Sequence, residues 1–325
     1  MKLLIITQVV DRNHPILGFF HRWLVEFAKN AEHIHVIALQ TGDYDLPKNV
    51  TVHSLGKERG TNKFQQLTTF YLLLSKLHRE YDGVFVHMNP EYIVLAGWIW
   101  RLTGKTLGLW YMHKSVDLKL RFAEVFAQHI FTATPGSFRL QSKKVQIMGH
   151  GIDVDVFTPG ATVERAEHLL SVGRLMKTKR HDLVIEAAAA SRKPVRIIGE
   201  GEERERLAAL AQKLGAKVEM PAGLSHKDLP DEYRRAAMFV HTSETGSLDK
   251  VVLEALACGC PVVTTNPTYT DMPVTIADPT TESLSRAVCA PTYTNTEDLY
   301  TYVKKNHSLQ HLIPNILEVY AAHNF

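Results

Sequence analysis

Short apolar runs rich in β-branched residues alternate along this chain with longer segments whose apolar residues recur at helical spacing. In the first half the short runs are KLLIIT, HIHVIALQ, VTVHSL, GVFVHM, TLGLWYMH, HIFTAT and VQIMGHG. The helical segments between them are LGFFHRWLVEFAKN, residues 62–80, the apolar segment after Pro90, and LRFAEVFAQ. Strands that alternate with helices predict β-α-β units and a parallel sheet.

The second half repeats this alternation. Its predicted strands are HLLSVGR, PVRIIGEG, AKVEMPAG, MFVHTSE, PVVTT and VTIAD, and its predicted helices are DLVIEAAAAS, EERERLAALAQKLG, DLPDEYRRAA and VVLEALACG. The polar segment HGIDVDVFTPGATVERAEH, with its Gly and Pro residues, is typical of a linker. The pattern therefore predicts an α/β protein with two doubly wound domains facing a central cleft, residues 1–152 and 153–306. A last helix, 307–325 with Pro314 near its middle, is expected to pack back on the first domain.

Length and charge agree with this organisation. The 325 residues exceed one ordinary core and suit two domains of about 150 residues each. A net charge of +3 excludes the general basic field that nucleic-acid binding requires, so no nucleic-acid partner is expected. The three cysteines, at 258, 260 and 289, form no disulfide framework and no metal or redox motif, which favours a reducing cytoplasm.

Two apolar stretches bear on the location of the protein. MKLLIITQVVD ends at Asp11 and Arg12 without a small-residue cleavage site, so we interpret it as the first strand rather than a signal peptide. The most hydrophobic helix, Tyr92 to Leu102, is shorter than the roughly 20 residues that cross a bilayer. It is either a packed helix or at most a surface anchor, which leaves peripheral contact with the inner face of a membrane open.

The candidate chemistry gathers in the second half. Open parallel sheets bind ligands outside the carboxyl ends of their strands. In the loop SVGRLMKTK, Gly173 allows a tight turn, and Arg174 and Lys179 precede a helix that begins near Asp182. Cations beside a positive helix end favour a bound di-anion such as a pyrophosphate, although solvated surface cations are the simpler alternative. Glu254 is the only charge in VVLEALACG and is placed to receive a ribose diol, or else to pair with a neighbour.

At these loops the sequence resembles the retaining family 4 glycosyltransferases of the GT-B fold. The resemblance covers about residues 145–265 and rests on VGRLMKTKRHDLVIEA, IIGEGEERERLAALAQKLG, the LP-x-x-YR pattern of DLPDEYRRAAMFVHTSE, and LEALACGCPVVTT. The first half matches through HGIDVDVF and through His113 after TLGLWYM. The resemblance implies two Rossmann-like domains and a nucleotide-sugar co-substrate, for which a UDP- or GDP-sugar is expected. It implies no metal or other cofactor.

The resemblance also implies roles for single residues. Arg174 and Lys179 would hold the diphosphate of the donor, and Glu254 would accept the ribose hydroxyls. His113 corresponds in placement to the active-site histidine of the family, near the transferred sugar. The predicted catalytic set is therefore His113, Arg174 and Lys179, in a front-face reaction that retains the anomeric configuration.

One stretch departs from the family pattern. Where family members carry Glu-Gly-Phe-Gly, this chain has Gly246, Ser247, Leu248 and Asp249. Counting back from Glu254 puts glycine at the place of the first glutamate, while Glu244 lies two residues too early. This departure motivates an alternative function, a nucleotide-sugar binding protein without transferase turnover.

Several neighbouring residues are available to replace the missing glutamate. Glu244, Asp249 and Lys250 can each reach sugar hydroxyls or phosphate, or the last two form a plain surface ion pair. Glu200 and Gly201 either contact the donor or only form a sheet-to-helix turn. The complete predicted donor-binding set is Gly173, Glu200, Gly201, Glu244, Gly246, Ser247, Leu248, Asp249, Lys250 and Glu254.

The acceptor side is expected in the first half. In NHPILGFFHRW, Gly18 and His21 follow the first strand and either shape the acceptor site or form a glycine turn and a helix face. The aromatic residues beside them are expected in the core rather than at a membrane. The acceptor stays open among a glycan, a lipid-linked molecule and a small molecule.

Overall fold

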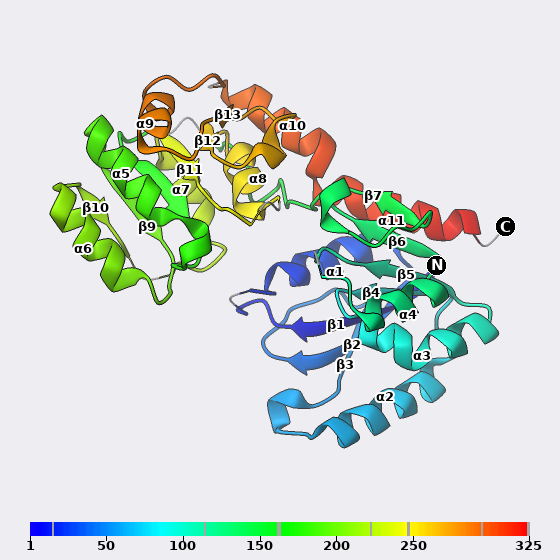
Figure 1. Cartoon of the computed structure of the whole chain (residues 1–325). Helices are drawn as coiled ribbons and strands as arrows, with labels where there is room; N and C mark the ends of the chain where they lie inside the picture. Colours follow the sequence, from blue (N-terminus) through cyan, green and yellow to red (C-terminus); the bar gives the residue numbers. More distant parts are fainter. Residues whose placement is uncertain are drawn as a thin grey trace. The chain divides into compact units, whose positions relative to one another are not determined.

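The computed structural model describes residues 1–14, 16–113, 115–160, 164–221, 223–245, 248–293 and 295–323. It divides into two compact units, Met1–Gly151 with Leu309–Phe325, and Ile152–Ser308. Each unit is a parallel sheet covered by helices, as Figure 1 shows. The prediction of two parallel-sheet α/β domains is confirmed.

Within the described residues, the sheet of the first unit has seven strands in the order β3-β2-β1-β4-β5-β6-β7, all parallel. The strands are β1 (Lys2–Val10), β2 (His33–Thr41), β3 (Val50–Ser54), β4 (Gly83–His87), β5 (Thr106–Trp110), β6 (His129–Thr132) and β7 (Val145–Ile147). The strand order reverses between β1 and β4. The carboxyl ends of these two strands therefore form a topological switch point, the usual ligand position in such sheets.

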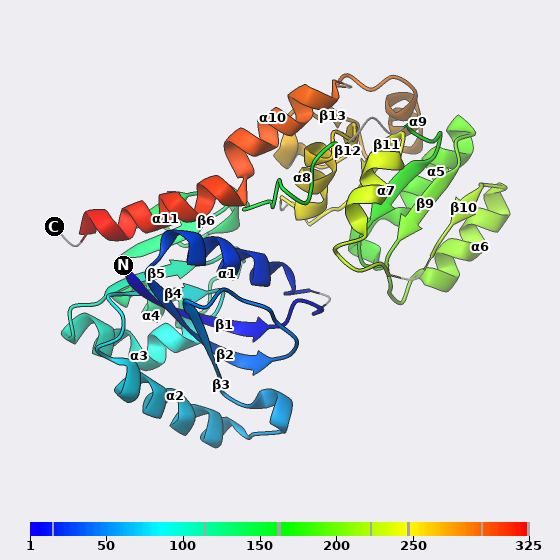
Figure 2. The ribbon, with the colours of Figure 1, turned by 180° about the vertical axis from the view of Figure 1, so that it is seen from behind.

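Helices cover both faces of this sheet (Figure 2). One face carries α1 (Phe19–Asn30) and α11 (Leu309–His323), and the other carries α2 (Lys63–Leu77), α3 (Pro90–Leu102) and α4 (Leu118–Phe126). The buried Tyr320 of α11 donates its hydroxyl to the carbonyl of Val84, 236 positions away, at 2.7 Å. Glycine at position 108 leaves room for this ring, because a Cβ there would lie 2.2 Å from the Tyr320 hydroxyl.

The sheet of the second unit has six described strands in the order β10-β9-β8-β11-β12-β13, again all parallel. They are β8 (Leu169–Val172), β9 (Val195–Ile198), β10 (Val218–Glu219), β11 (Met238–His241), β12 (Val262–Thr264) and β13 (Thr275–Ile276). The helices are α5 (His181–Ser191), α6 (Arg204–Leu214), α7 (Leu229–Arg235), α8 (Lys250–Ala257), α9 (Thr281–Cys289) and α10 (Thr296–His307). The pattern analysis missed the last two helices, although Thr280 and Asn295 cap their first turns through their side chains.

The segment predicted as a linker begins inside the second core. Ile152, Val154 and Phe157 are buried there, and a turn brings Phe157 into the core, with its amide donating to the carbonyl of Asp153 at 2.9 Å. The amide of Ile152 donates to the carbonyl of His307 at 2.7 Å. The chain thus leaves the first unit after Gly151 and returns to it at Leu309.

Candidate functional site

Two glycine-bearing loops pack against each other at the carboxyl edge of the second sheet. The loop after β8 begins at Gly173, and the loop after β9 contains Gly199 and Gly201. A Cβ on Gly199 would lie 1.9 Å from the carbonyl oxygen of Gly173, and one on Gly201 would lie 2.2 Å from that of Leu175. Glycine is therefore required at positions 199 and 201, because the two loop backbones are in contact there. Gly201 thus has a packing role, whether or not it also contacts a ligand.

The two predicted cations of the first loop differ in their surroundings. Arg174 is exposed, and its side chain makes no hydrogen bond or ion pair within the described part of the chain. Lys179 lies in a 3₁₀ turn, Lys177–Lys179, where its Nζ forms an ion pair with Asp249 and donates to Ser243 Oγ at 3.3 Å. One cation is thus open to an incoming anion, while the other is already held by a carboxylate.

Asp249 connects three loops of this edge. It precedes α8, and its Oδ2 lies 3.1 Å from Nε2 of the buried His241 at the end of β11. Burial raises the pKa of Asp249, but the His241 hydrogen bond and the Lys179 charge outweigh burial and hold this pKa well below its ordinary range. Because an ionised carboxylate only accepts, Nε2 of His241 donates to Asp249, and Nδ1 of the same ring lies 3.0 Å from Thr264 Oγ1.

The loop after β11 is fastened to the loop after β8. The hydroxyl of Thr242 donates to the carbonyls of Lys179 and Arg180, each at 2.9 Å. Arg180 has a φ of 51°, and its guanidinium lies 2.6 Å from Oε1 of Glu244. Glu244, predicted to bind the donor, therefore neutralises a cation beside the predicted phosphate position.

Glu254 lies in the middle of α8 and is buried. Its Oε1 is 3.0 Å from Nε2 of His226, and its Oε2 accepts from the hydroxyl of Tyr233 at 3.3 Å. The ring of Phe157 lies 5.0 Å from that of His226, centroid to centroid. The lone carboxylate of this helix is thus paired by two residues from the segment before β11.

The remaining predicted donor residues have varied settings. Glu200 accepts from the backbone amide of Gly223 at 2.9 Å, which ties two loops of the same edge together. Leu248 is buried in the apolar core of the unit. Burial lowers the pKa of Lys250 to about 8, opposed by the charge of Glu254. The other two predicted residues, Gly246 and Ser247, lie outside the described residues.

Four residues of this edge were not among the predicted site residues: His226, Tyr233, His241 and Ser243. His241 and Ser243 carried a usable signal, since polar residues at the end of a buried strand point to the ligand edge of a sheet. Tyr233 lies inside the LP-x-x-YR pattern. His226 has no such signal in one sequence.

In the first unit, a pocket of about 350 Å³ lies at the carboxyl ends of β1, β4 and β5. We call it the polar pocket; its lining includes Gln8, His87, Asn89, Glu91, Tyr111 and His113. His113 is exposed, with Nδ1 2.6 Å from Ser115 Oγ. Met88 in its wall has a φ of 63°, and non-glycine residues in this conformation cluster at functional sites.

The two residues predicted for the acceptor, Gly18 and His21, both have structural contacts. Gly18 closes a tight turn before α1, because a Cβ there would lie 2.7 Å from the carbonyl oxygen of His14. Nε2 of His21 accepts from the amide of Asp45 at 3.1 Å, which holds the loop after β2. Leu17, beside them, does line the polar pocket. The aromatic Phe20 and Trp23 are buried in the core, as expected.

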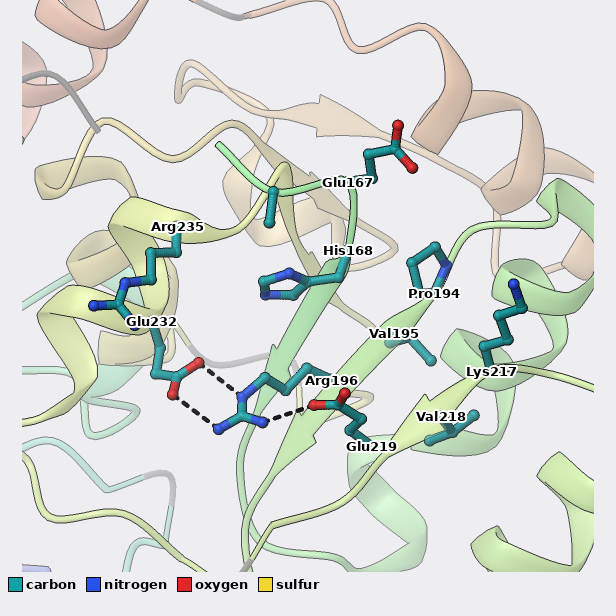
Figure 3. Close-up of a pocket in the computed structure, with 11 residues that line it drawn as sticks. Glu167, His168, Pro194, Val195, Arg196, Lys217, Val218, Glu219, Glu232 and Arg235 are labelled. Carbon is teal, nitrogen blue, oxygen red and sulfur yellow. Dashed lines mark hydrogen bonds and ion pairs between the residues drawn. The ribbon is translucent and has the colours of Figure 1, made fainter. Parts of the chain in front are cut away.

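A larger depression of about 690 Å³ lies at the amino ends of β8, β9 and β10, away from the loops described above (Figure 3). Arg196 crosses it and pairs with Glu232 at 2.8 Å and with Glu219 at 2.9 Å. Two carboxylates already neutralise this guanidinium. We therefore interpret the depression as a structural ion-pair site.

Among the described residues, no three His, Cys, Asp or Glu side chains form a group that could hold a metal ion. None of the helices in the described part of the chain has the length and apolar character needed to span a membrane.

Two parallel Rossmann-like sheets, with loops gathered at their carboxyl edges, define a protein of the GT-B fold. Over 99% of this chain and 100% of the other, the structure is similar to that of Alr3699/HepE from Anabaena, solved in complex with UDP, with a TM-score of 0.77. The two sequences are only 16% identical, so this likeness concerns the fold.

Residues 157–306 match the family model described as Glycosyl transferases group 1. This match lies within the second unit of the chain.

Curated relatives support the same family. A Campylobacter jejuni N-acetylgalactosamine-N,N'-diacetylbacillosaminyl-diphospho-undecaprenol 4-alpha-N-acetylgalactosaminyltransferase is 32% identical over 136 residues, 40% of this chain and 37% of its own length. A D-inositol 3-phosphate glycosyltransferase of Kribbella flavida is 35% identical over 148 residues, 38% of this chain and 35% of its own length. The chain thus matches little more than a third of each relative's length.

Proposed function

We propose that this protein transfers a sugar from a nucleotide-diphosphate-sugar to an acceptor hydroxyl, with retention and without a metal. The observation that carries the proposal is the arrangement of Arg174, Lys179 and Glu254 on the loops and helix of a group 1 glycosyltransferase unit. UDP or GDP is the proposed nucleotide carrier, and the UDP bound to the Anabaena neighbour supports UDP.

The proposed reaction needs charge stabilisation more than a nucleophile. The bond between the anomeric carbon and the β-phosphate oxygen breaks, and a bond to the acceptor oxygen forms on the same face. The acceptor hydroxyl gives its proton to the leaving phosphate. Arg174, with no side-chain partner in the described structure, would bind the phosphate charge directly, and Lys179 would share its charge between Asp249 and the phosphate.

Glu254 is suited to hold the ribose. His226 and Tyr233 each contact one of its two oxygens, and a carboxylate has about four acceptor positions. Ribose hydroxyls can therefore donate to the free positions without displacing either partner. The two existing contacts fix the carboxylate before the donor arrives, which lowers the entropy cost of binding.

On the acceptor side we propose the polar pocket of the first unit, with His113 beside the reacting hydroxyl. A cytoplasmic location, with contact to the inner face of a membrane when the acceptor is lipid-linked, completes the proposal. The alternative function, binding of a nucleotide-sugar without turnover, is favoured by one observation. Glycine stands at the position of the first family glutamate.

Thermal-shift measurements with UDP, GDP and ADP test the donor site. A nucleotide at 100 times its Kd should stabilise the protein by roughly 2.7 kcal/mol, and Arg174→Ala combined with Lys179→Ala should remove that shift. An unchanged shift in the double variant would contradict the diphosphate assignment. Incubation with a panel of labelled donors separates the two functions, because the binding protein would show neither transfer nor donor hydrolysis.

A further inference from the structure

The polar pocket of the first unit continues into a second hollow. Gln8, Asn89 and Glu91 line both the polar pocket and a groove of about 370 Å³. We call this second hollow the apolar groove, after the apolar and aromatic half of its lining: Leu39, Leu55, Leu67, Phe70, Tyr92 and Leu95. A ligand that enters the polar pocket can therefore extend into apolar surroundings.

The groove lies at the ligand edge of the sheet, between α2 and α3. Gln8 and Leu39 are near the carboxyl ends of β1 and β2, and Leu55 directly follows β3. The rings of Phe70 on α2 and Tyr92 on α3 are 5.1 Å apart, centroid to centroid. The groove is thus built from three strand ends and two helices of one unit.

Apolar side chains also continue from the groove onto the outer surface. On α2, α3 and α4, exposed large apolar residues recur at helical spacing, so that each helix carries an apolar stripe turned to solvent. The stripes are Phe64, Leu67 and Tyr71, then Val94, Trp98 and Leu102, then Leu118, Phe122 and Val125. Surface helices normally show polar residues there, and contiguous exposed apolar surface marks a binding site.

We infer that the acceptor is an anionic amphiphile, whose hydroxyl-bearing head lies in the polar pocket beside His113 and whose hydrocarbon chain lies in the apolar groove. The inference rests on the proposed function, since it names the acceptor class of the same site. A glycan in this groove would place some of its hydroxyls against four leucines and Phe70, whose side chains offer no hydrogen-bond partner, at a cost in free energy. A hydrocarbon chain gains free energy from the same burial.

The charges of the groove favour an anion in the amphiphile. Lys63 and Lys119 both line it, and Glu91 is the one carboxylate among the described lining residues. Lys119 pairs with Glu91 at 2.8 Å, which leaves Lys63 as the surplus cation. A phosphate on the part of the ligand that lies in the groove would meet this charge.

Photolabelling of the full chain tests the inference directly. The probe is hexadecyl phosphate carrying a diazirine in its chain, and the adducts are mapped by mass spectrometry. We expect adducts on α2 and α3 around the groove, competed by dodecyl phosphate and not by inorganic phosphate. Among shorter unlabelled alkyl phosphates, competition should strengthen about fourfold per methylene until the groove is filled.

Two leucines of α2 provide a matched pair of variants. Leu67 lines the groove, whereas Leu72 is 65% exposed and does not belong to its described lining. Leu67→Gln should reduce labelling about threefold to tenfold, and Leu72→Gln should leave it unchanged. Equal effects of both variants, adducts spread over the second unit, or displacement by inorganic phosphate would overturn the inference, as would a dimer that hides these helices.

Donor binding separates this inference from the proposed function. The UDP thermal shift, measured on both variants, also shows whether each is folded. If UDP does not raise the melting temperature of the wild-type protein, the proposed function fails. Labelling of the groove would then still show that it binds an alkyl phosphate. If the nucleotide shift is intact and the groove is not labelled, only the amphiphilic acceptor is wrong.

Discussion

Lys179 and Asp249 form an ion pair that joins the first loop of the second sheet to the start of α8, 70 positions further along the chain. The same carboxylate accepts from His241, so it is fixed from two sides. A negative charge therefore stands beside the cation that the proposed mechanism assigns to the donor phosphate. Any diphosphate that binds there has to share Lys179 with Asp249.

Asp249→Asn should strengthen nucleotide binding. The change removes a negative charge beside the proposed phosphate site and keeps the shape of the side chain, so the Kd for UDP should fall about tenfold at low salt, and less at high salt. Sugar transfer should fall at the same time, because Lys179 loses the contact that positions it. Isothermal titration at two salt concentrations measures the first effect. A weaker nucleotide complex would mean that Asp249 itself binds the donor.

Glu254→Gln should abolish recognition of the ribose. Hydrogen bonds to charged groups contribute about 1.5 to 3 kcal/mol, so the variant should bind UDP roughly tenfold to a hundredfold more weakly. The loss should be smaller for 2′-deoxy-UDP, since that ligand lacks one of the two hydroxyls. His226→Gln serves as the control, because it keeps the carboxylate and removes one of its partners. Equal losses for both nucleotides in Glu254→Gln would place the carboxylate away from the ribose.

Stability should decrease as the pH falls below about 6.5. Burial lowers the pKa of His181 to about 4, so the unfolded chain takes up a proton that the folded chain does not. The contribution of this histidine to stability is complete above its unfolded pKa and is lost between about pH 6.5 and pH 4. Urea unfolding at pH 7 and pH 5 should show the loss, and His181→Gln should flatten the dependence. Burial also lowers the pKa of His307 to about 4. The pH dependence of stability that comes from His307 should therefore remain in His181→Gln.

Tyr320 and Gly108 should be energetically coupled. Tyr320→Phe removes one buried hydrogen bond and should cost about 0.5 to 1.5 kcal/mol. Gly108→Ala should cost more, since its Cβ meets the Tyr320 hydroxyl, and the double variant should be more stable than the sum of the two losses predicts. Chemical denaturation of the four proteins gives the coupling energy. Simple additivity would mean that the backbone at Gly108 shifts instead.

Much of the fold is readable from the local pattern. Runs such as KLLIIT and PVVTT became β1 and β12 because strands buried in a parallel sheet are continuously apolar. The two missed helices, α9 and α10, lie in polar sequence where only their caps mark them. The segment after Gly151 was interpreted as a linker because its Gly, Pro and charges outweigh three separated apolar residues.

The candidate site is readable in part. The glycine loops, Arg174 and the acid of α8 come in a family order that a single sequence displays. The partners of Glu254 cannot be found in this way, because His226 and Tyr233 lie more than twenty positions from it in the sequence. The place of Gly18 and His21 after the first strand predicts an acceptor role, and the structure adds a turn at Gly18 and a loop contact of His21 that the sequence does not show.

The sequence by itself determined the alternation of strands and helices, the family of the second unit and the edge of the sheet where charged loops gather. These features depend on local periodicity and on short motifs, which need no distant contact. Only the tertiary structure decided that Lys179 is paired with Asp249, that Tyr320 of the last helix donates to the carbonyl of Val84, and that the polar pocket opens into the apolar groove. Such contacts depend on strand order, which brings together side chains that are far apart in the chain.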